Sequence, residues 1–234
     1  KDAKIDTLAI PHIFQEGRWT FDFEEMEKQV SSKTKIFILC NPQNPLGRNF
    51  TKDEVTKVAE FCDRHSLVLV SDEIHCDLVF DESEGAFYSA LKLPENLRQK
   101  LIVLQAPSKT YNIAGMGYAF AVIENPSIRN TFCATRGHTL SEINCLAFFA
   151  AEAAYKHGEP WRQELLTYLK KNRDTITQFV RSELAGCSIP DIEATYLALI
   201  DTRGAGMKNP AQYLEKDAQV WVNDGAAFGA PDHF

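Results

Sequence analysis

The sequence predicts an α/β fold: a mostly parallel sheet sandwiched by helices, followed by a small α+β domain. Short apolar runs of strand type occur at residues 36–40, 67–70, 101–104 and 119–123. An amphipathic helical pattern separates the first two runs, and β-α-β order gives parallel strands with right-handed crossovers. The composition of the 234 residues, 44% hydrophobic and 24% charged, is that of a globular protein.

The first half of the chain defines the sheet. Residues 36–40, Ile-Phe-Ile-Leu-Cys, form a continuous apolar run, which is typical of a strand buried on both faces. The helix that follows is expected at residues 51–65, because Thr51 and Glu54 form a capping box at its start. Its apolar positions share one face at helical spacing: Val55, Val58, Ala59 and Cys62.

The second half has a different pattern. Residues 141–157 are rich in Ala, Phe and Leu and predict a well-buried helix, and residues 160–184 predict a long amphipathic helix. After a break come an expected strand, helix and strand, at 196–201, 210–217 and 220–222. We therefore divide the chain into a partial large domain, connecting helices and a partial small domain, at residues 1–140, 141–185 and 186–234.

Charge and cysteine usage exclude several classes of protein. A net charge of -7 and a pI near 5.4 argue against nucleic acid or an anionic membrane as the main partner. No apolar run approaches the length of a bilayer span, and residues 1–6 do not have the pattern of a signal peptide. The six cysteines contain no C-x-x-C pair, so we expect reduced, buried packing residues of a cytoplasmic protein: Cys40, Cys62, Cys76, Cys133, Cys145 and Cys187.

Polar side chains stand at or just past the carboxyl ends of three expected strands. Asn41 follows the first, Asp72 the second, and Lys109 follows the third after a Pro-Ser break. In such sheets ligands collect beyond these strand ends. Each residue also has an ordinary interpretation: a turn residue in Asn-Pro-Gln-Asn-Pro-Leu-Gly, a helix N-cap, and a surface lysine.

The three residue types suit one cofactor. A lysine beside an apolar core loses its proton more readily than a solvated one, because desolvation disfavours the charged form, and a neutral amine is a Schiff-base nucleophile. A carboxylate keeps a heteroaromatic nitrogen protonated, and an amide donates to an oxygen of the same ligand. Asn41, Asp72 and Lys109 on neighbouring strand ends therefore predict a pyridoxal phosphate pocket.

Three segments carry a family resemblance. Residues 41–47, 71–77 and 106–115 resemble, in the right order, three signatures of fold-type I, class I/II aminotransferase-like enzymes. Asp-Glu-Ile-His and Pro-Ser-Lys-Thr-Tyr-Asn are most similar to the cystathionine β-lyase/C–S lyase branch, and residues 151–161 are also typical of it. The large domain would then be the one that binds pyridoxal 5'-phosphate.

The resemblance implies roles for five residues. Lys109 would bind the cofactor covalently and later carry the Cα proton. Asp72 would pair with the pyridinium nitrogen, and Asn41 would hydrogen-bond the phenolic oxygen. His75, where many relatives have a tyrosine, would lie near the same oxygen, and Ser108 would help to bind the phosphate. A capping or core histidine with its hydrogen bonds satisfied is the alternative for His75.

The resemblance implies a carbon–sulfur β-lyase that splits cystathionine or a cysteine-type amino acid by α,β-elimination into thiol, pyruvate and ammonia. Many aminotransferases carry a phosphate-binding arginine shortly after the lysine, and residues 115–118 contain none, which favours a lyase. The alternatives are an aminotransferase, and a non-catalytic fragment or degenerate relative.

The family is longer than this chain. The resemblance implies that a phosphate-binding loop and a stacking aromatic residue precede Lys1, and that the arginine for the substrate carboxylate follows Phe234. The chain is therefore expected to be an incomplete piece of an enzyme. The apolar helix at 141–157 suits a dimer or domain interface, and we expect a homodimer; a core helix of a monomer is the alternative.

Overall fold

The computed structural model describes residues 5–81, 83, 86–137 and 142–234. Contacts divide the chain into two compact units, which are described separately. The sheet unit comprises residues 35–176 and 192–198, and the terminal unit comprises residues 1–34, 177–191 and 199–234.

The sheet unit is built on four strands in the order β3-β4-β5-β6: β3 (Ile36–Cys40), β4 (Val68–Asp72), β5 (Leu101–Gln105) and β6 (Phe120–Val122). β3, β4 and β5 are parallel, and β6 pairs antiparallel with β5. The register sets Cys40 opposite Asp72, and Asp72 opposite Leu104. The prediction of a mostly parallel α/β sheet is confirmed.

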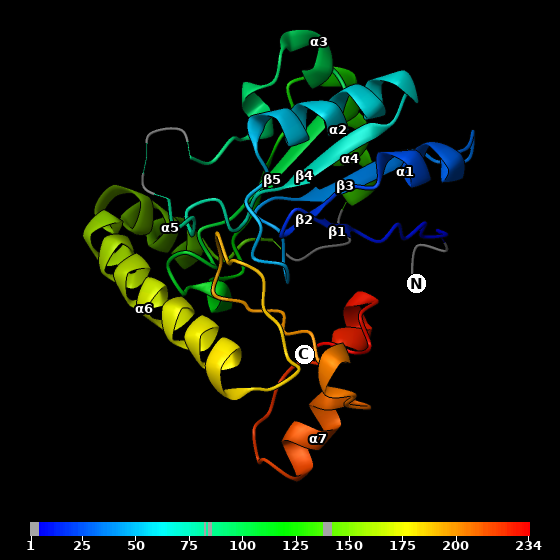
Figure 1. The fold of residues 1–234 in the computed structure, drawn as a ribbon. Coiled ribbons are helices and arrows are strands. Elements are labelled where there is room, and N and C mark those ends of the chain that lie inside the picture. The colour runs from blue at the N-terminus through cyan, green and yellow to red at the C-terminus, as the bar shows by residue number, and fades with distance from the viewer. Residues whose placement is uncertain (1–4, 82, 84–85, 138–141) are drawn as a thin grey trace. The chain divides into compact units, whose positions relative to one another are not determined.

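Helix α2 (Lys52–Arg64) lies along this sheet (Figure 1). It begins where the capping box predicts: the Thr51 hydroxyl accepts from the Glu54 N–H, and the Glu54 carboxylate accepts from the Thr51 N–H. Its buried side chains are the predicted apolar face with one addition: Val55, Val58, Ala59, Phe61 and Cys62. Local capping and helical periodicity therefore fix this element.

The sheet unit has further helical segments, and α6 runs from this unit into the terminal unit. They are η1 (Ala90–Lys92), α3 (Glu95–Arg98), η2 (Ala114–Met116), α4 (Pro126–Arg136), α5 (Cys145–His157) and α6 (Glu159–Glu183). Only Gly158 separates α5 from α6 (Figure 1). Ser141, where the sequence predicts the start of α5, lies outside the described residues.

Two burial predictions are wrong. In α5 only Ala147 and Ala151 are buried, while its large apolar side chains are exposed: Leu146, Phe148, Phe149 and Tyr155. On β3, Ile36 and Ile38 are 51% and 72% exposed, so one face of this strand is not buried by the described residues. An apolar run without a periodic polar face shows that an element is hydrophobic, but it does not predict which other part of the protein, if any, packs against it.

The terminal unit contains the hairpin of β1 (Ile13–Gln15) and β2 (Arg18–Thr20), which pair antiparallel, and helix α1 (Phe23–Gln29). It also contains the end of α6, and η3 (Arg203–Ala205), α7 (Pro210–Lys216) and η4 (Gly225–Phe228).

Helix α7 confirms the prediction at 210–217. Among the described residues from 196 to 234 there is no strand, so the two strand predictions are wrong: residue 201 makes only isolated bridges, with Ser188 and His233. The division into three functional domains stays a prediction.

The cysteine prediction holds in part. All six cysteines are free. Cys62 is buried in the core, and burial raises the pKa of its thiol to about 12, which suits a packing residue. Cys133 and Cys145 are exposed, so the packing prediction is wrong for these two.

Candidate functional site

The carboxyl ends of β3, β4 and β5 meet at one edge of the sheet, because these strands are parallel. Asp72 is the last residue of β4, and Asn41 directly follows β3. The Asn41 N–H donates to the Asp72 carbonyl oxygen at 2.9 Å, which extends the ladder by one residue. The structure therefore brings these two predicted residues together.

The Asn41 side chain is buried and held in one orientation. Its carboxamide oxygen accepts from the Phe50 N–H at 2.9 Å. Only the oxygen of a carboxamide can accept a hydrogen bond, so this bond fixes which end of the Asn41 side chain faces Phe50. The amide nitrogen, with its two donor hydrogens, points away from Phe50. An amide donor at this strand end is what the sequence predicts.

Asp72 does not cap a helix. Residues 74–77 form turns, and one Asp72 carboxylate oxygen accepts from the Ile74 N–H at 3.2 Å. The N-cap interpretation is therefore wrong, because no helix follows β4 directly. The carboxylate lies half-buried at the strand end.

His75 follows in the same turn and is 1% exposed. Neither ring nitrogen has a hydrogen-bond partner among the described residues, so the interpretation as a satisfied core histidine does not hold. Burial is the main reason why the pKa of His75 is lowered; the charge of Lys109 lowers it further, and that of Asp72 opposes both. The charges of both Asp72 and Lys109 thus act on the buried His75 ring.

Lys109 and Ser108 are half-buried in a tight loop after β5. The Tyr111 N–H donates to the Pro107 carbonyl at 3.0 Å, and the Ile113 N–H donates to the Ser108 carbonyl at 3.1 Å. These bonds fix the backbone that carries Lys109. The charge of the Lys109 amine acts on the His75 ring and contributes to the lowered pKa of that imidazole.

Glu73 is a buried acid that sequence reasoning missed. Its carboxylate accepts from the hydroxyls of Ser71 and Ser89, the Ala90 N–H and the Gln105 carboxamide, at 2.7 to 3.3 Å. Burial raises the pKa of Glu73 although these hydrogen bonds act in the opposite direction. Glu73 ties the end of β4 to the end of β5. No sequence signal identifies it, because glutamates are mostly exposed.

Arg48 is the second missed residue, 2% exposed and directly after Gly47. Its guanidinium binds both oxygens of Glu54, at 2.7 and 2.9 Å, and also binds the Glu193 carboxylate. It therefore joins the turn after Asn41 to α2 and to the segment at 192–198. No local pattern identifies this role, because the Glu193 partner lies 145 positions further along the chain.

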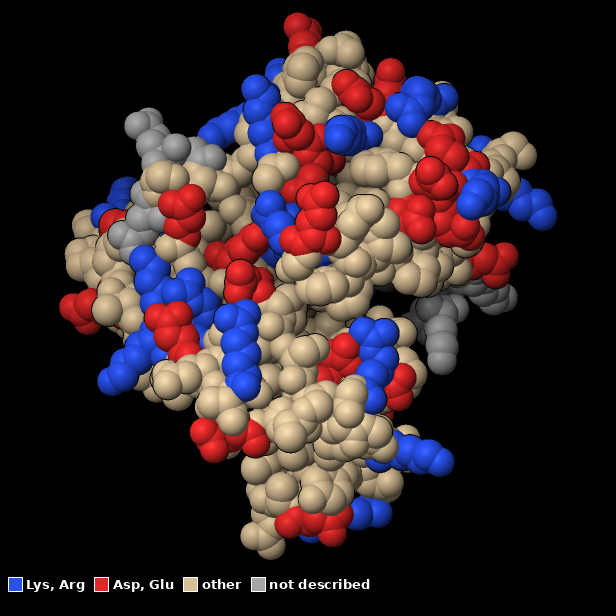
Figure 2. All heavy atoms as spheres, in the orientation of Figure 1, with Lys and Arg blue, Asp and Glu red and all other residues tan. Residues whose placement is uncertain are grey.

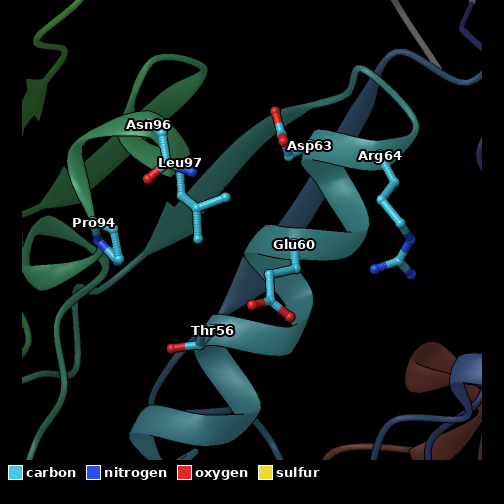
Figure 3. A pocket seen from close by; sticks show the side chains of 7 residues that line it. All are labelled: Thr56, Glu60, Asp63, Arg64, Pro94, Asn96 and Leu97. Carbon is cyan, nitrogen blue, oxygen red and sulfur yellow. The ribbon is translucent and has the colours of Figure 1, made fainter.

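A groove on the other side of this unit is distinct from these strand ends. It has a volume of about 410 Å³ and lies between α2 and α3 (Figure 3), lined by Thr56, Glu60, Asp63, Arg64, Pro94, Asn96 and Leu97. α2 ends shortly before β4 begins, and α3 ends shortly before β5 begins, so the groove lies near the amino ends of these strands. Ligands of parallel sheets bind at the opposite edge.

The surface and the metal-binding side chains add two observations. On the face drawn in Figure 2, acidic and basic side chains are interspersed. Across the described parts of the chain, no three His, Cys, Asp or Glu side chains are grouped so that they could hold a metal ion. No helix in the same parts is both long enough and apolar enough to cross a membrane.

A helix-covered, mostly parallel sheet, with an amide, a carboxylate, an imidazole and a lysine at the carboxyl ends of its parallel strands, defines a cofactor-binding α/β fold. Residues 3–234 match the family described as "Aminotransferase class I and II". The chain therefore belongs to the class I and II aminotransferase family.

Relatives and solved structures support this assignment. The chain is 33% identical over 226 residues to cystathionine beta-lyase PatB of Bacillus subtilis, covering 95% of this chain and 58% of the relative. It is 32% identical over 220 residues to protein MalY of Escherichia coli, covering 92% and 55%. The crystal structure of cystalysin from Treponema denticola, which contains a pyridoxal 5'-phosphate cofactor, matches with a TM-score of 0.88 and 33% identity, covering 95% of this chain and 57% of that one. The chain thus spans somewhat more than half the length of the proteins it matches.

Proposed function

We propose that this chain is part of a pyridoxal phosphate-dependent carbon–sulfur lyase that acts on sulfur amino acids of the cystathionine or cysteine type. The observation that carries the proposal is the buried His75, whose two ring nitrogens have no partner among the described residues, beside Asp72 and Lys109. Buried polar groups are almost always hydrogen-bonded, so such a ring indicates a ligand. The named relatives indicate the reaction.

The side chains at the strand ends fit pyridoxal phosphate. The Asp72 carboxylate would hold the proton on the ring nitrogen, and the Asn41 amide would donate to the phenolic oxygen, with His75 beside it. Ser108 would contribute to the phosphate site, and Lys109 would hold the cofactor covalently. Each group matches one polar atom of the cofactor in charge or in hydrogen-bonding character.

When bound, the cofactor supplies a ring that accepts electron density from the Cα atom of an amino acid. The Lys109 amine would take the Cα proton of the substrate onto Nζ. The bond from Cβ to sulfur would then break, and its electron pair would leave on the thiolate. Asp72 would lower the barrier by keeping the ring nitrogen cationic. Water would hydrolyse the three-carbon enamine that remains, so that the products are thiol, pyruvate and ammonia.

The test is an assay of the intact protein with cystathionine and pyridoxal phosphate, without any keto-acid acceptor. We expect pyruvate and thiol in equal amounts, and a loss of at least about a thousandfold in Lys109→Ala. Lys92→Ala, an exposed lysine on η1, is the matched control and is expected to keep full activity. Borohydride reduction followed by peptide mapping should place the pyridoxyl group on Lys109.

Two outcomes would assign another function. If cystathionine is converted only when a keto acid is added, and then to its own keto acid, the protein is an aminotransferase, which the family also contains. Absence of a visible absorption band with saturating cofactor would favour a non-catalytic relative. A homodimeric state and a cytoplasmic location stay predictions.

A further inference from the structure

The ring of Tyr196 lies edge-on against the imidazole of His75. The ring centroids are 5.6 Å apart and the planes are inclined at 67°. This is the geometry that aromatic pairs prefer, with the edge of one ring towards the face of the other. Neither nitrogen of His75 is hydrogen-bonded to a described residue, so no hydrogen bond fixes the orientation of the imidazole. The contact with Tyr196 restricts how this ring can turn.

The backbone beside Tyr196 is held in a conformation that its sequence does not favour. Thr195 is fully buried and has φ +71°, a region that β-branched residues rarely adopt. Its N–H donates to the Leu78 carbonyl at 2.8 Å, and its hydroxyl accepts from the Leu197 N–H at 3.1 Å. Such an outlier persists only when its surroundings enforce it, and it indicates a position with a function.

A second set of bonds ties the same segment to the turn that begins at Asn41. The N–H groups of Glu193 and Ala194 both donate to the Gly47 carbonyl, at 2.8 and 3.0 Å. The Glu193 carboxylate binds the buried Arg48. Tyr196 therefore directly follows residues 193–195, which are bonded both to the turn after Asn41 and to Leu78.

We propose that Tyr196 is a positioning residue whose ring holds the His75 imidazole so that a ring nitrogen can hydrogen-bond the bound cofactor. The inference rests on the proposed pyridoxal phosphate site and adds a residue from a segment more than 100 positions away in the sequence. Tyr196 is 47% exposed, so its ring can be altered without removing a core side chain. The competing interpretation is a surface tyrosine that touches His75 without affecting it.

The experiment compares Tyr196→Phe and Tyr196→Ala in the intact protein, with Tyr213→Ala as a matched control at 50% exposure. The first readout is the titration of His75 by NMR without added cofactor, with the resonance assigned from His75→Gln. Removal of the ring lets water reach the imidazole. Because burial is the main cause of the lowered pKa of His75, the midpoint in Tyr196→Ala should rise towards the ordinary histidine pKa, while the opposing effects of the Lys109 and Asp72 charges stay as they are. Tyr196→Phe and Tyr213→Ala should leave the midpoint unchanged.

The second readout is the equilibrium dissociation constant for pyridoxal phosphate. Tyr196→Ala should weaken binding by about tenfold, the effect of one misplaced hydrogen bond, and Tyr196→Phe by less than about twofold. An unchanged midpoint and dissociation constant in Tyr196→Ala would overturn the proposal, as would equal losses in the Phe and Ala variants. If the wild-type protein binds no cofactor, the proposed function fails, while the His75 titration still decides whether Tyr196 controls this ring.

Discussion

Replacing Gly47 by alanine tests whether the turn after Asn41 is as tightly packed against residues 192–194 as the structure indicates. Gly47 has φ +64°, and an added Cβ would lie 2.8 Å from Cγ2 of Ile192 and 3.3 Å from the Ala194 carbonyl oxygen. The backbone conformation and the contact should both cost stability. Gly117 separates the two effects, because it has φ +63° in the same unit and no atom within 4 Å of its added Cβ.

The expected free energies follow from these two contributions. The left-handed conformation costs an alanine about 1–2 kcal/mol, partly offset by the lower entropy of the unfolded chain, so Gly117→Ala should lose about 1 kcal/mol. Overpacking against Ile192 adds about 1–3 kcal/mol. Gly47→Ala should therefore lose about 2–4 kcal/mol in the free energy of unfolding.

Equilibrium urea unfolding of the apo-protein, followed by circular dichroism, measures both losses, if each transition is two-state. Ile192→Leu removes the methyl group that the new Cβ would meet, at a cost below about 1.5 kcal/mol. In that background Gly47→Ala should lose less than it does alone, and this difference is the coupling energy of the contact. Equal losses in Gly47→Ala and Gly117→Ala would refute the close packing.

Three further predictions concern charge and capping. Arg48→Met leaves two glutamates without their shared cation and should cost about 3 kcal/mol in the free energy of unfolding. Burial raises the pKa of one of them, Glu54, but the Thr51 N–H and the Arg48 charge outweigh burial, so the pKa of Glu54 is lowered. Wild-type stability should therefore fall as the pH drops below the usual value of about 4.5, and it should fall less steeply in the variant. The lowered pKa of His75 means that the unfolded chain binds its proton first, so stability should rise with pH through the window just below 6.5, and His75→Gln should lack this slope in denaturant titrations. Thr51→Ala should lose about 1 kcal/mol through the N-cap, whereas Thr56→Ala inside the same helix should be neutral or stabilising; equal losses in thermal unfolding would contradict the capping argument.

The site shows how far sequence reasoning reaches. Asn41, Asp72 and Lys109 could be placed at neighbouring strand ends because each follows an apolar run, and because β-α-β order makes the strands parallel. Tyr196 and Arg48 could not be placed, since their partners lie far along the chain. Pairing over such separations leaves no local pattern.

Local sequence determined the elements whose causes are local: the capping box and apolar face of α2, the apolar runs of β3, β4 and β5, and the residues at the ends of these strands. Outside α2, tertiary structure decided which side chains are buried and which partners they have. It left the large side chains of α5 exposed, made no strands at 196–201 and 220–222, and left the nitrogens of His75 without a described partner. The physical reason is that a strand needs a neighbouring strand, and a buried polar group needs a partner, and both are supplied by residues distant in sequence.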